Sequence, residues 1–152
     1  MQKIKPCFWF DHDVEEVMNF YLSIFKDGKV ISVHHADGKV LAVDFVIRDQ
    51  EVMAINGGPM FKLSEAASLF VSCESQAEVD EYWEKLSAGG EKSRCGWLKD
   101  KYGLSWQVIP SALMKLIGDP DPKKANAVMQ AMLKMDKIVI ADLEKAYRAE
   151  AA

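Results

Sequence analysis

The sequence repeats one pattern of strand, capped helix and turn at a constant offset of 62 residues. Matching positions in the two copies share a physical role: a ring in a strand, a helix cap, an acidic partner of that cap, a ring in the helix, or a terminating glycine. The pairs are Phe8 with Phe70, Asp13 with Ser75, Glu16 with Glu78, Tyr21 with Trp83 and Gly28 with Gly90. Because the five roles differ, their joint recurrence indicates a duplicated structural unit.

The first copy reads as a strand, a helix and three further strands. Ile4–Phe10 is a short apolar run, and Asp13 followed by Glu16 is an acidic form of the helix capping box. The helix has a single apolar stripe and ends before an Asp-Gly turn. The later strands are predicted at Lys29–His35, Lys39–Ile47 and Glu51–Ile55, with hairpin turns at Asp37-Gly38 and Asp49-Gln50.

The predicted fold class is α+β. A βαβββ unit cannot cover both faces of its small sheet alone, so we expect two units to join around a shared concave surface. Residues 1–152 are predicted to form a single domain, with repeat one at 3–58, repeat two at 66–110 and a helical tail at 111–149. In the tail, Lys123–Lys134 is predicted to be a helix, and Asp136 is predicted to cap the last helix.

The second copy closes with a short strand, a tight reversal at Asp100–Gly103 and a strand at Leu104–Ile109. Gly103 supplies the positive φ that such a turn needs. Alternation along the last strand separates polar from apolar side chains, and this places Gln107 on the polar face.

Composition favours a globular protein and argues against nucleic-acid and membrane partners. Of 152 residues, 49% are hydrophobic and 28% are charged, and the net charge is −4 with Lys and Arg scattered along the chain. No apolar run approaches the roughly 18 residues that span a bilayer, and the first ten residues lack the apolar region of a signal peptide.

The three cysteines predict reduced thiols and a cytoplasmic location. Cys7, Cys73 and Cys95 are odd in number and show no CxxC spacing. Cys7 and Cys73 are predicted on the helix-facing side of their strands, together with Trp9 and Val71.

Four stretches carry a family resemblance: CFWFDHDVEEVMNFY, INGGP, CESQAEVDEYW and GGEKSRCGWLKDKYGLSWQVIP. The paired βαβββ pattern is similar to the vicinal oxygen chelate (glyoxalase/bleomycin resistance/dihydroxybiphenyl dioxygenase) superfamily. The four stretches resemble its PhnB-like branch, often labelled 3-demethylubiquinone-9 3-methyltransferase-like, and so does the tail AVMQAMLKMDKIVIADLEKAYR. The resemblance implies a glyoxalase/bleomycin-resistance-like concave sheet.

The resemblance also implies where metal-dependent members of the superfamily carry His or Glu ligands. In this sequence those places fall at Pro6, at or beside Asn56, at Ser68 and at Gln107. None is an ionisable ligand, so no metal and no other cofactor is expected. Instead we expect an aromatic pocket for a small ligand with carbonyl or hydroxyl groups. Its predicted ligand-binding residues are Phe8, Phe10, Asn56, Ser68, Phe70 and Gln107.

Other candidates for catalysis have structural alternatives, and the sequence identifies no catalytic residue. Asp11, His12 and Asp13 form a carboxylate–histidine cluster, but they lie at a helix start where Asp13 has a capping role. His34 and His35 are adjacent in a strand, so at most one can line a pocket and carry a proton; solvent exposure is the alternative. Gly57-Gly58 leads into a proline rather than a helix, unlike a site for S-adenosylmethionine.

Four functions stay open, and the sequence does not decide whether the protein is an enzyme. The first is a small-molecule-binding protein that acts as a metal-independent enzyme on an oxygenated or quinone-like substrate. The others are a non-catalytic ligand-sequestering protein of the resistance type, a methyltransferase, as the family label says, and a dimeric structural module whose cleft is vestigial. A homodimer is also expected, because the resemblance implies pockets completed across a two-fold interface. The Met- and Ala-rich stripe of Lys123–Lys134 offers an apolar surface for it.

Overall fold

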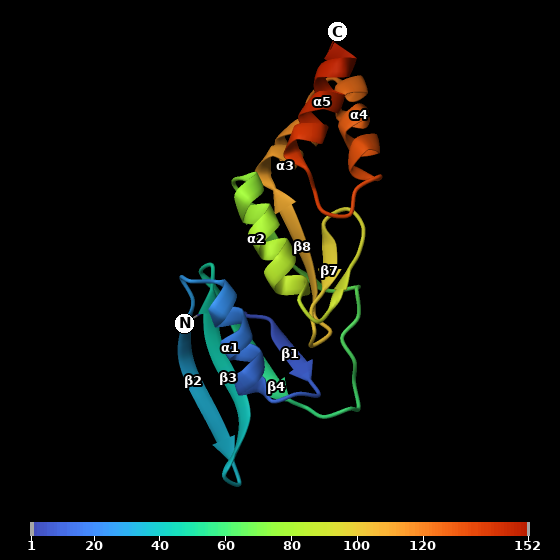
Figure 1. Cartoon of the computed structure of the whole chain (residues 1–152). Coiled ribbons are helices and arrows are strands. Elements are labelled where there is room, and N and C mark those ends of the chain that lie inside the picture. The colour runs from blue at the N-terminus through green and yellow to red at the C-terminus, as the bar shows by residue number, and fades with distance from the viewer. Residues whose placement is uncertain (1, 152) are drawn as a thin grey trace. The chain divides into compact units, whose positions relative to one another are not determined.

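The computed structural model describes residues 2–151 and divides the chain into two compact units, Met1–Ser64 and Glu65–Ala152. Each unit contains one four-stranded sheet with a helix on one of its faces (Figure 1). The strand orders are β1-β4-β3-β2 and β5-β8-β7-β6, so the second sheet repeats the topology of the first. The predicted α+β class with two βαβββ units is confirmed; the single-domain arrangement stays a prediction.

In the first unit, β1 is parallel to β4, and the other two pairings are antiparallel. The elements are β1 (Cys7–Phe10), α1 (Val14–Ile24), β2 (Lys29–Ala36), β3 (Lys39–Ile47) and β4 (Gln50–Asn56). The helix begins where predicted, because the Asp13 side chain accepts a hydrogen bond from the backbone N–H of Glu15 at 3.0 Å.

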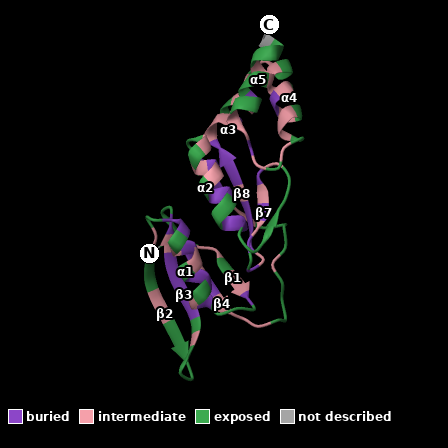
Figure 2. Cartoon of the chain, in the orientation of Figure 1, coloured by how far each residue is buried: buried purple, intermediate pink, exposed green. Residues whose placement is uncertain are grey.

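The core of the first unit lies between α1 and one face of the sheet. The ring of Tyr21 in α1 stacks on Phe45 of β3, with 6.2 Å between centroids. The strand register places Phe8 beside Ala54, and Ala54 beside Val43, so these residues share the helix-facing side with Phe45. Figure 2 shows β3 as one of the most buried strands.

Of the two hairpin turns in the first unit, the sequence predicts one correctly and places the other turn one residue too late. Asp37 and Gly38 have φ values of 50° and 74°, as the predicted Asp-Gly hairpin requires. The second turn is formed by Arg48 and Asp49, with φ values of 47° and 63°. This turn lies one residue earlier than predicted. The sequence gives little indication of it, because both of its left-handed residues are residues other than glycine.

In the second unit, β5 is parallel to β8, and β7 is antiparallel to both β6 and β8. The elements are β5 (Ser68–Cys73), α2 (Gln76–Ser87), β6 (Glu91–Lys92), β7 (Trp97–Lys99) and β8 (Ser105–Pro110). The predicted cap is confirmed, since the Ser75 hydroxyl accepts from the Glu78 N–H at 3.2 Å. Gly103 has a φ of 90°, as the predicted reversal requires.

The tail of the second unit forms a small helical cluster of its own. Its helices are α3 (Ser111–Ile117), α4 (Pro122–Met132) and α5 (Ile140–Ala151). The buried residues of the cluster are Ile109, Leu113, Val128, Ile138 and Leu143. Asp136 does not cap α5 as predicted; the Gln76 side chain instead accepts from the Ile140 N–H at 2.8 Å. The apolar stripe of α4 packs into this cluster, since Val128 is fully buried and Met132 lies against it.

Candidate functional site

The second sheet has one face covered by α2 and an opposite face rich in polar groups. Strand register places Phe70 beside Gln107, and Gln107 beside Trp97. Ser68 is paired with Ser105 on the same side. This face, opposite α2, is the helix-free face of the second unit.

Three of the six predicted ligand-binding residues come together on this face. The Gln107 amide donates a hydrogen bond from Nε2 to the Ser68 hydroxyl at 3.0 Å. Phe70 lies next to Gln107 on the neighbouring strand, and half of its side chain is exposed. The arrangement presents a polar pair beside two aromatic rings, Phe70 and Trp97.

The other three predicted residues lie in the first unit, on its helix-facing side. Phe10 is 1% exposed, and its ring contacts Phe8 edge-on at 6.4 Å between centroids. The Asn56 amide accepts from the Val14 N–H at 3.2 Å and donates to the Val40 carbonyl at 2.7 Å. These contacts attach the start of α1 to the sheet. A ligand-binding role for Phe8, Phe10 and Asn56 stays a prediction.

The 62-residue offset matches the helices of the two repeats, but it does not match the faces of their strands. Helix-facing residues are even-numbered in β1, such as Phe10, and odd-numbered in β5, such as Val71 and Cys73. The cap follows β1 by three residues and β5 by two. An offset of 62 therefore pairs residues on opposite faces, since a one-residue slip turns every side chain over.

The prediction that Cys7 and Trp9 lie on the helix-facing side of β1 is wrong, because the strand is shifted by this one residue. Cys7 is exposed. Trp9 donates from its indole to the Gly58 carbonyl at 2.8 Å, and its ring meets Phe61 at 5.1 Å between centroids. Although Cys7 as a whole is exposed, partial burial of its thiol, together with the negative charge of Asp44, raises the pKa of that thiol and disfavours the thiolate that binds metals.

A buried carboxylate, missed by the sequence analysis, occupies the helix-free face of the first unit. Asp44 accepts hydrogen bonds from Lys5, from His34 Nε2 at 2.8 Å and from the Ser32 hydroxyl at 3.1 Å. Burial opposes ionisation, but these three hydrogen bonds outweigh it and keep the pKa of Asp44 below its ordinary value. The hydrogen bond between Lys5 and Asp44 also raises the pKa of Lys5. Of the adjacent histidines His34 and His35, it is therefore His34 that is oriented by a hydrogen bond to Asp44.

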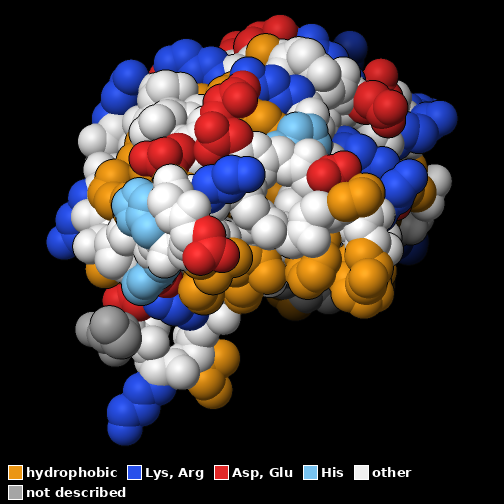
Figure 3. Space-filling model, turned by 90° about the horizontal axis from the view of Figure 1, so that it is seen from below, with side chains coloured by type: hydrophobic (Ala, Val, Ile, Leu, Met, Phe, Trp, Pro, Cys, Tyr) orange, Lys and Arg blue, Asp and Glu red, His pale blue; other side chains and the backbone are white. Residues whose placement is uncertain are grey.

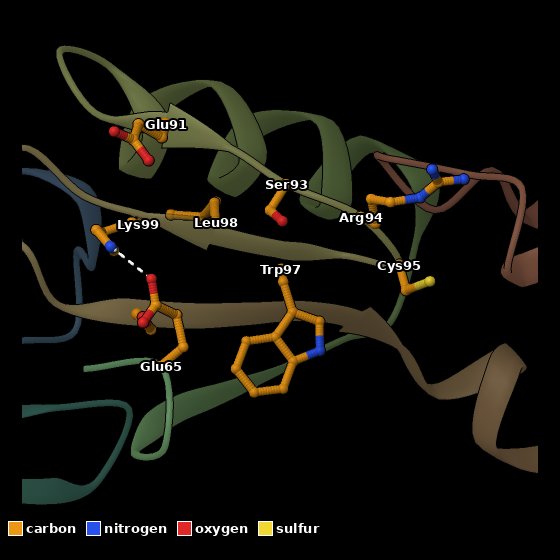
Figure 4. Close-up of a pocket in the computed structure, with 9 residues that line it drawn as sticks. Glu65, Glu91, Ser93, Arg94, Cys95, Trp97, Leu98 and Lys99 are labelled. Atoms are coloured by element: carbon orange, nitrogen blue, oxygen red, sulfur yellow. Dashed lines mark ion pairs between the residues drawn. The ribbon is translucent and has the colours of Figure 1, made fainter.

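A cavity of about 450 Å³ lies beside β6 and β7 in the second unit (Figure 4). Its lining residues are Glu65, Glu91, Ser93, Arg94, Cys95, Trp97, Leu98, Lys99 and Ser105. Figure 4 shows Glu65 and Lys99 pointing toward each other, and their charged atoms are 2.5 Å apart. The hydroxyl of Ser105 is buried and has no hydrogen-bond partner among the residues described.

The ion pair at this cavity holds two permanent charges. Its hydrogen bond lowers the pKa of Glu65 and raises the pKa of Lys99. Both groups are therefore charged near neutral pH, and neither is poised to exchange a proton there.

The residues at the implied metal places do not fit a divalent transition metal. Ser68 and Gln107 offer only neutral oxygens and bond to each other, and Asn56 uses its amide within the fold. The side chain of Pro6 has no ligand atom, and its carbonyl accepts from the Met53 N–H. In residues 2–151, no group of three His, Cys, Asp or Glu side chains is arranged to hold a metal ion.

Comparison with known proteins places the chain among proteins of similar fold. The family model described as 3-demethylubiquinone-9 3-methyltransferase matches residues 2–109, which leaves the tail helices outside the match. The PhnB protein from Bacillus cereus, provisionally named a 3-demethylubiquinone-9 3-methyltransferase, is 33% identical; the alignment covers 72% of this chain and all of that one, with a TM-score of 0.67. No protein of curated function matches.

Two more distant structures share the fold. A protein from Pseudomonas aeruginosa is 19% identical over 72% of this chain and 98% of its own, with a TM-score of 0.62. The fosfomycin resistance protein FosX from Listeria monocytogenes, solved with Mn(II) and sulfate, is 18% identical over 70% of this chain and 90% of its own, with a TM-score of 0.54. The fold is thus of the glyoxalase/bleomycin-resistance type, as the resemblance implied.

Proposed function

This chain belongs to the 3-demethylubiquinone-9 3-methyltransferase (PhnB-like) family, and we propose that it binds a small oxygenated molecule on the helix-free face of its second unit. The observation that carries the proposal is the Gln107–Ser68 pair, joined at 3.0 Å and flanked by Phe70 and Trp97. An amide and a hydroxyl can donate to and accept from a ligand carbonyl or hydroxyl group, while the rings contact its apolar part.

Binding without a transition metal follows from the chemistry of the donors. Neutral oxygens cannot offset the charge of a divalent cation, and Ser68 and Gln107 offer no other kind of donor. We therefore propose that no transition metal and no other cofactor takes part in recognition.

Of the open functions, ligand sequestration is supported by the cavity of the second unit. Its ion pair, Glu65 and Lys99, keeps both side chains charged near neutral pH, so neither is suited to transfer a proton to or from a ligand. Methyl transfer has less support, because Gly57 and Gly58 are followed by a segment without a helix up to residue 67.

A second candidate function, a metal-independent enzyme acting on an oxygenated or quinone-like molecule, is favoured by one observation. His34 Nε2 donates to the buried carboxylate of Asp44, and this leaves Nδ1 of a neutral imidazole with a lone pair. A histidine oriented by a carboxylate is the usual arrangement of a general base.

The remaining proposals concern partners and location. We retain a homodimer and a cytoplasmic location, supported by the family resemblance and by three free thiols. The α4 stripe gives the dimer less support than expected, because its residues Val128 and Met132 pack within the tail. Acidic and basic side chains are interspersed on the face drawn in Figure 3, which supports the absence of a nucleic-acid partner. No helix in residues 2–151 is long and apolar enough to cross a bilayer.

The test is a thermal-shift titration with acetovanillone, an aromatic ketone that also carries a hydroxyl group, in the presence and absence of EDTA. Binding to the native state raises the unfolding temperature. We expect a rise that EDTA leaves unchanged and that Gln107→Ala removes, while the matched exposed variant Gln130→Ala retains it. A rise that requires added metal would contradict the proposal.

A further inference from the structure

One wall of the 450 Å³ cavity is held by the C-terminal tail. The wall segment is Ser93–Gly96, of which Ser93, Arg94 and Cys95 line the cavity. The backbone N–H groups of Cys95 and Gly96 donate to the carbonyls of Met135 and Asp136, at 2.8 and 2.7 Å. The connection between α4 and α5 thus forms the outer support of this wall.

Two side chains of the wall segment add to this support. The Arg94 guanidinium donates to the Leu133 carbonyl at 3.2 Å. The Cys95 thiol lies 3.6 Å from the Met132 carbonyl, within the range of a sulfur hydrogen bond. Figure 4 shows Arg94 and Cys95 at the end of the cavity away from the Glu65–Lys99 pair.

The wall segment adopts a conformation that the chain does not prefer by itself. Cys95 and Gly96 have φ values of 58° and 82°. The left-handed region is unfavourable for a cysteine, so tertiary hydrogen bonds must maintain it. At Gly96 a side chain has no room, because a Cβ would lie 2.7 Å from Ile109 Cδ1 and 2.8 Å from the Val108 carbonyl oxygen.

The tail is itself anchored to α2 by the side chain of Gln76. Gln76 donates from Nε2 to the Ile138 carbonyl at 3.0 Å and accepts from the Ile140 N–H at 2.8 Å. Ile138 is fully buried in the tail cluster. The position of the wall therefore depends on helices that lie outside residues 2–109, the part matched by the family model.

The cavity also contains an unused hydrogen-bonding group. Ser105 is 1% exposed, and its hydroxyl has no partner among the described residues. A buried hydroxyl without a partner is unfavourable, and a ligand hydroxyl or carbonyl group would satisfy it. Trp97, which neighbours Gln107 across the strands, supplies an aromatic surface beside it.

We propose that this cavity is a second compartment of the ligand site, which takes an aromatic ring bearing a hydroxyl or carbonyl group. The C-terminal helices select the ligand by holding the wall segment. The proposal deepens the proposed function and rests on it, because Trp97 links the compartment to Gln107.

The test is an NMR titration with naphthol and, as a probe without a hydroxyl, naphthalene. We expect naphthol to shift the indole N–H signal of Trp97. Ser105→Ala should weaken naphthol binding roughly tenfold and leave naphthalene binding unchanged, without lowering the unfolding temperature. The matched variant Ser72→Ala, which changes an exposed serine of the same sheet, should bind naphthol like wild type.

The tail is tested by Gln76→Leu, which removes both of its anchoring hydrogen bonds, and by Arg94→Met, which removes one bond of the wall in a chain with its tail intact. Each should weaken both probes severalfold, whereas the exposed control Gln130→Leu should not. Unchanged affinity in both variants would overturn the role of the tail.

Two other results separate this proposal from the proposed function. If naphthol shifts the Gln107 amide signals but not the Trp97 indole, the compartment is overturned and the proposed function stands. If wild type and Ser105→Ala bind naphthol equally, the compartment is also overturned.

Discussion

Asp100 is the residue whose loss we expect to damage the second sheet most. It is 2% exposed, and its carboxylate accepts hydrogen bonds from the turn and from the strand that follows it. The donors include the backbone N–H groups of Tyr102 and Leu104, at 2.9 and 3.1 Å, and the indole N–H of Trp106, at 2.8 Å. These contacts close the reversal between β7 and β8 and so fix the pairing of Trp97 with Gln107.

The size of the effect follows from the number of donors left without an acceptor. A hydrogen bond to a charged group contributes about 1.5–3 kcal/mol, and losses within one network are not additive. We expect Asp100→Ala to lower the free energy of unfolding by about 4 kcal/mol. Asp100→Asn should cost about 2 kcal/mol, because the amide oxygen can still serve the two backbone donors while its NH₂ group faces the indole.

The assay is urea unfolding followed by far-UV circular dichroism. The control is Asp142→Ala, at an exposed position, which should change the free energy of unfolding by no more than about 0.5 kcal/mol. An Asp100→Ala variant within about 1 kcal/mol of wild type would show that these hydrogen bonds do not hold the turn, and so would equal losses for the Ala and Asn variants.

Three further predictions concern stability. Asp44→Asn should destabilise the protein by about 2 kcal/mol at pH 7. Because the folded-state pKa of Asp44 is lowered, its stabilisation is present above the unfolded value near 3.9 and is lost as pH falls through the folded value; urea unfolding at pH 7 and pH 3 should show the difference shrinking, and a constant difference would be contrary evidence. Asn56→Ala should cost about 2 kcal/mol in urea unfolding, since it leaves the Val14 N–H and the Val40 carbonyl without their partner, and no loss would speak against that role. Lys99→Met should change the unfolding temperature little, because its ion pair with Glu65 is partly exposed, and a fall of ten degrees would be incompatible with this view.

The fold could be predicted to the extent that local signals determined it. Asp13 and Ser75 cap helices because their side chains bond within the next three residues, and such contacts are visible in the sequence. Gly103 and the Asp37-Gly38 pair mark turns for an equally local reason. By contrast, the start of α5 is fixed by a hydrogen bond to Gln76, which is distant in the sequence. The residues next to this helix start therefore give no signal of it.

Strand parity decides which of the predicted site residues share a face. Alternation predicts the polar face of β8 for Gln107, and the family resemblance implies Ser68 at a ligand position of β5; the pairing of these strands places both on one face with Phe70. Phe8 and Phe10 are expected in the same pocket, but they lie on the helix-facing side of β1, because the connection from strand to helix is one residue longer in the first repeat.

Asp44 illustrates a different limit. It lies within the apolar run of β3, and its three donors come from Lys5 and from two positions of β2. Only the register of the strands brings these groups together. A single charged residue in an apolar strand was the one signal that could have identified it, because a buried charge requires partners.

Metal-independent binding at Gln107 is tested most directly by calorimetric titration of acetovanillone into EDTA-treated wild type and Gln107→Ala. We expect wild type to bind without metal and Gln107→Ala to lose about 1–3 kcal/mol of binding free energy. Elemental analysis of the same wild-type sample should find no stoichiometric Zn, Ni, Mn or Fe. Equal affinity in the two proteins, or binding that appears only after a divalent metal is added, would rule out this mode of binding.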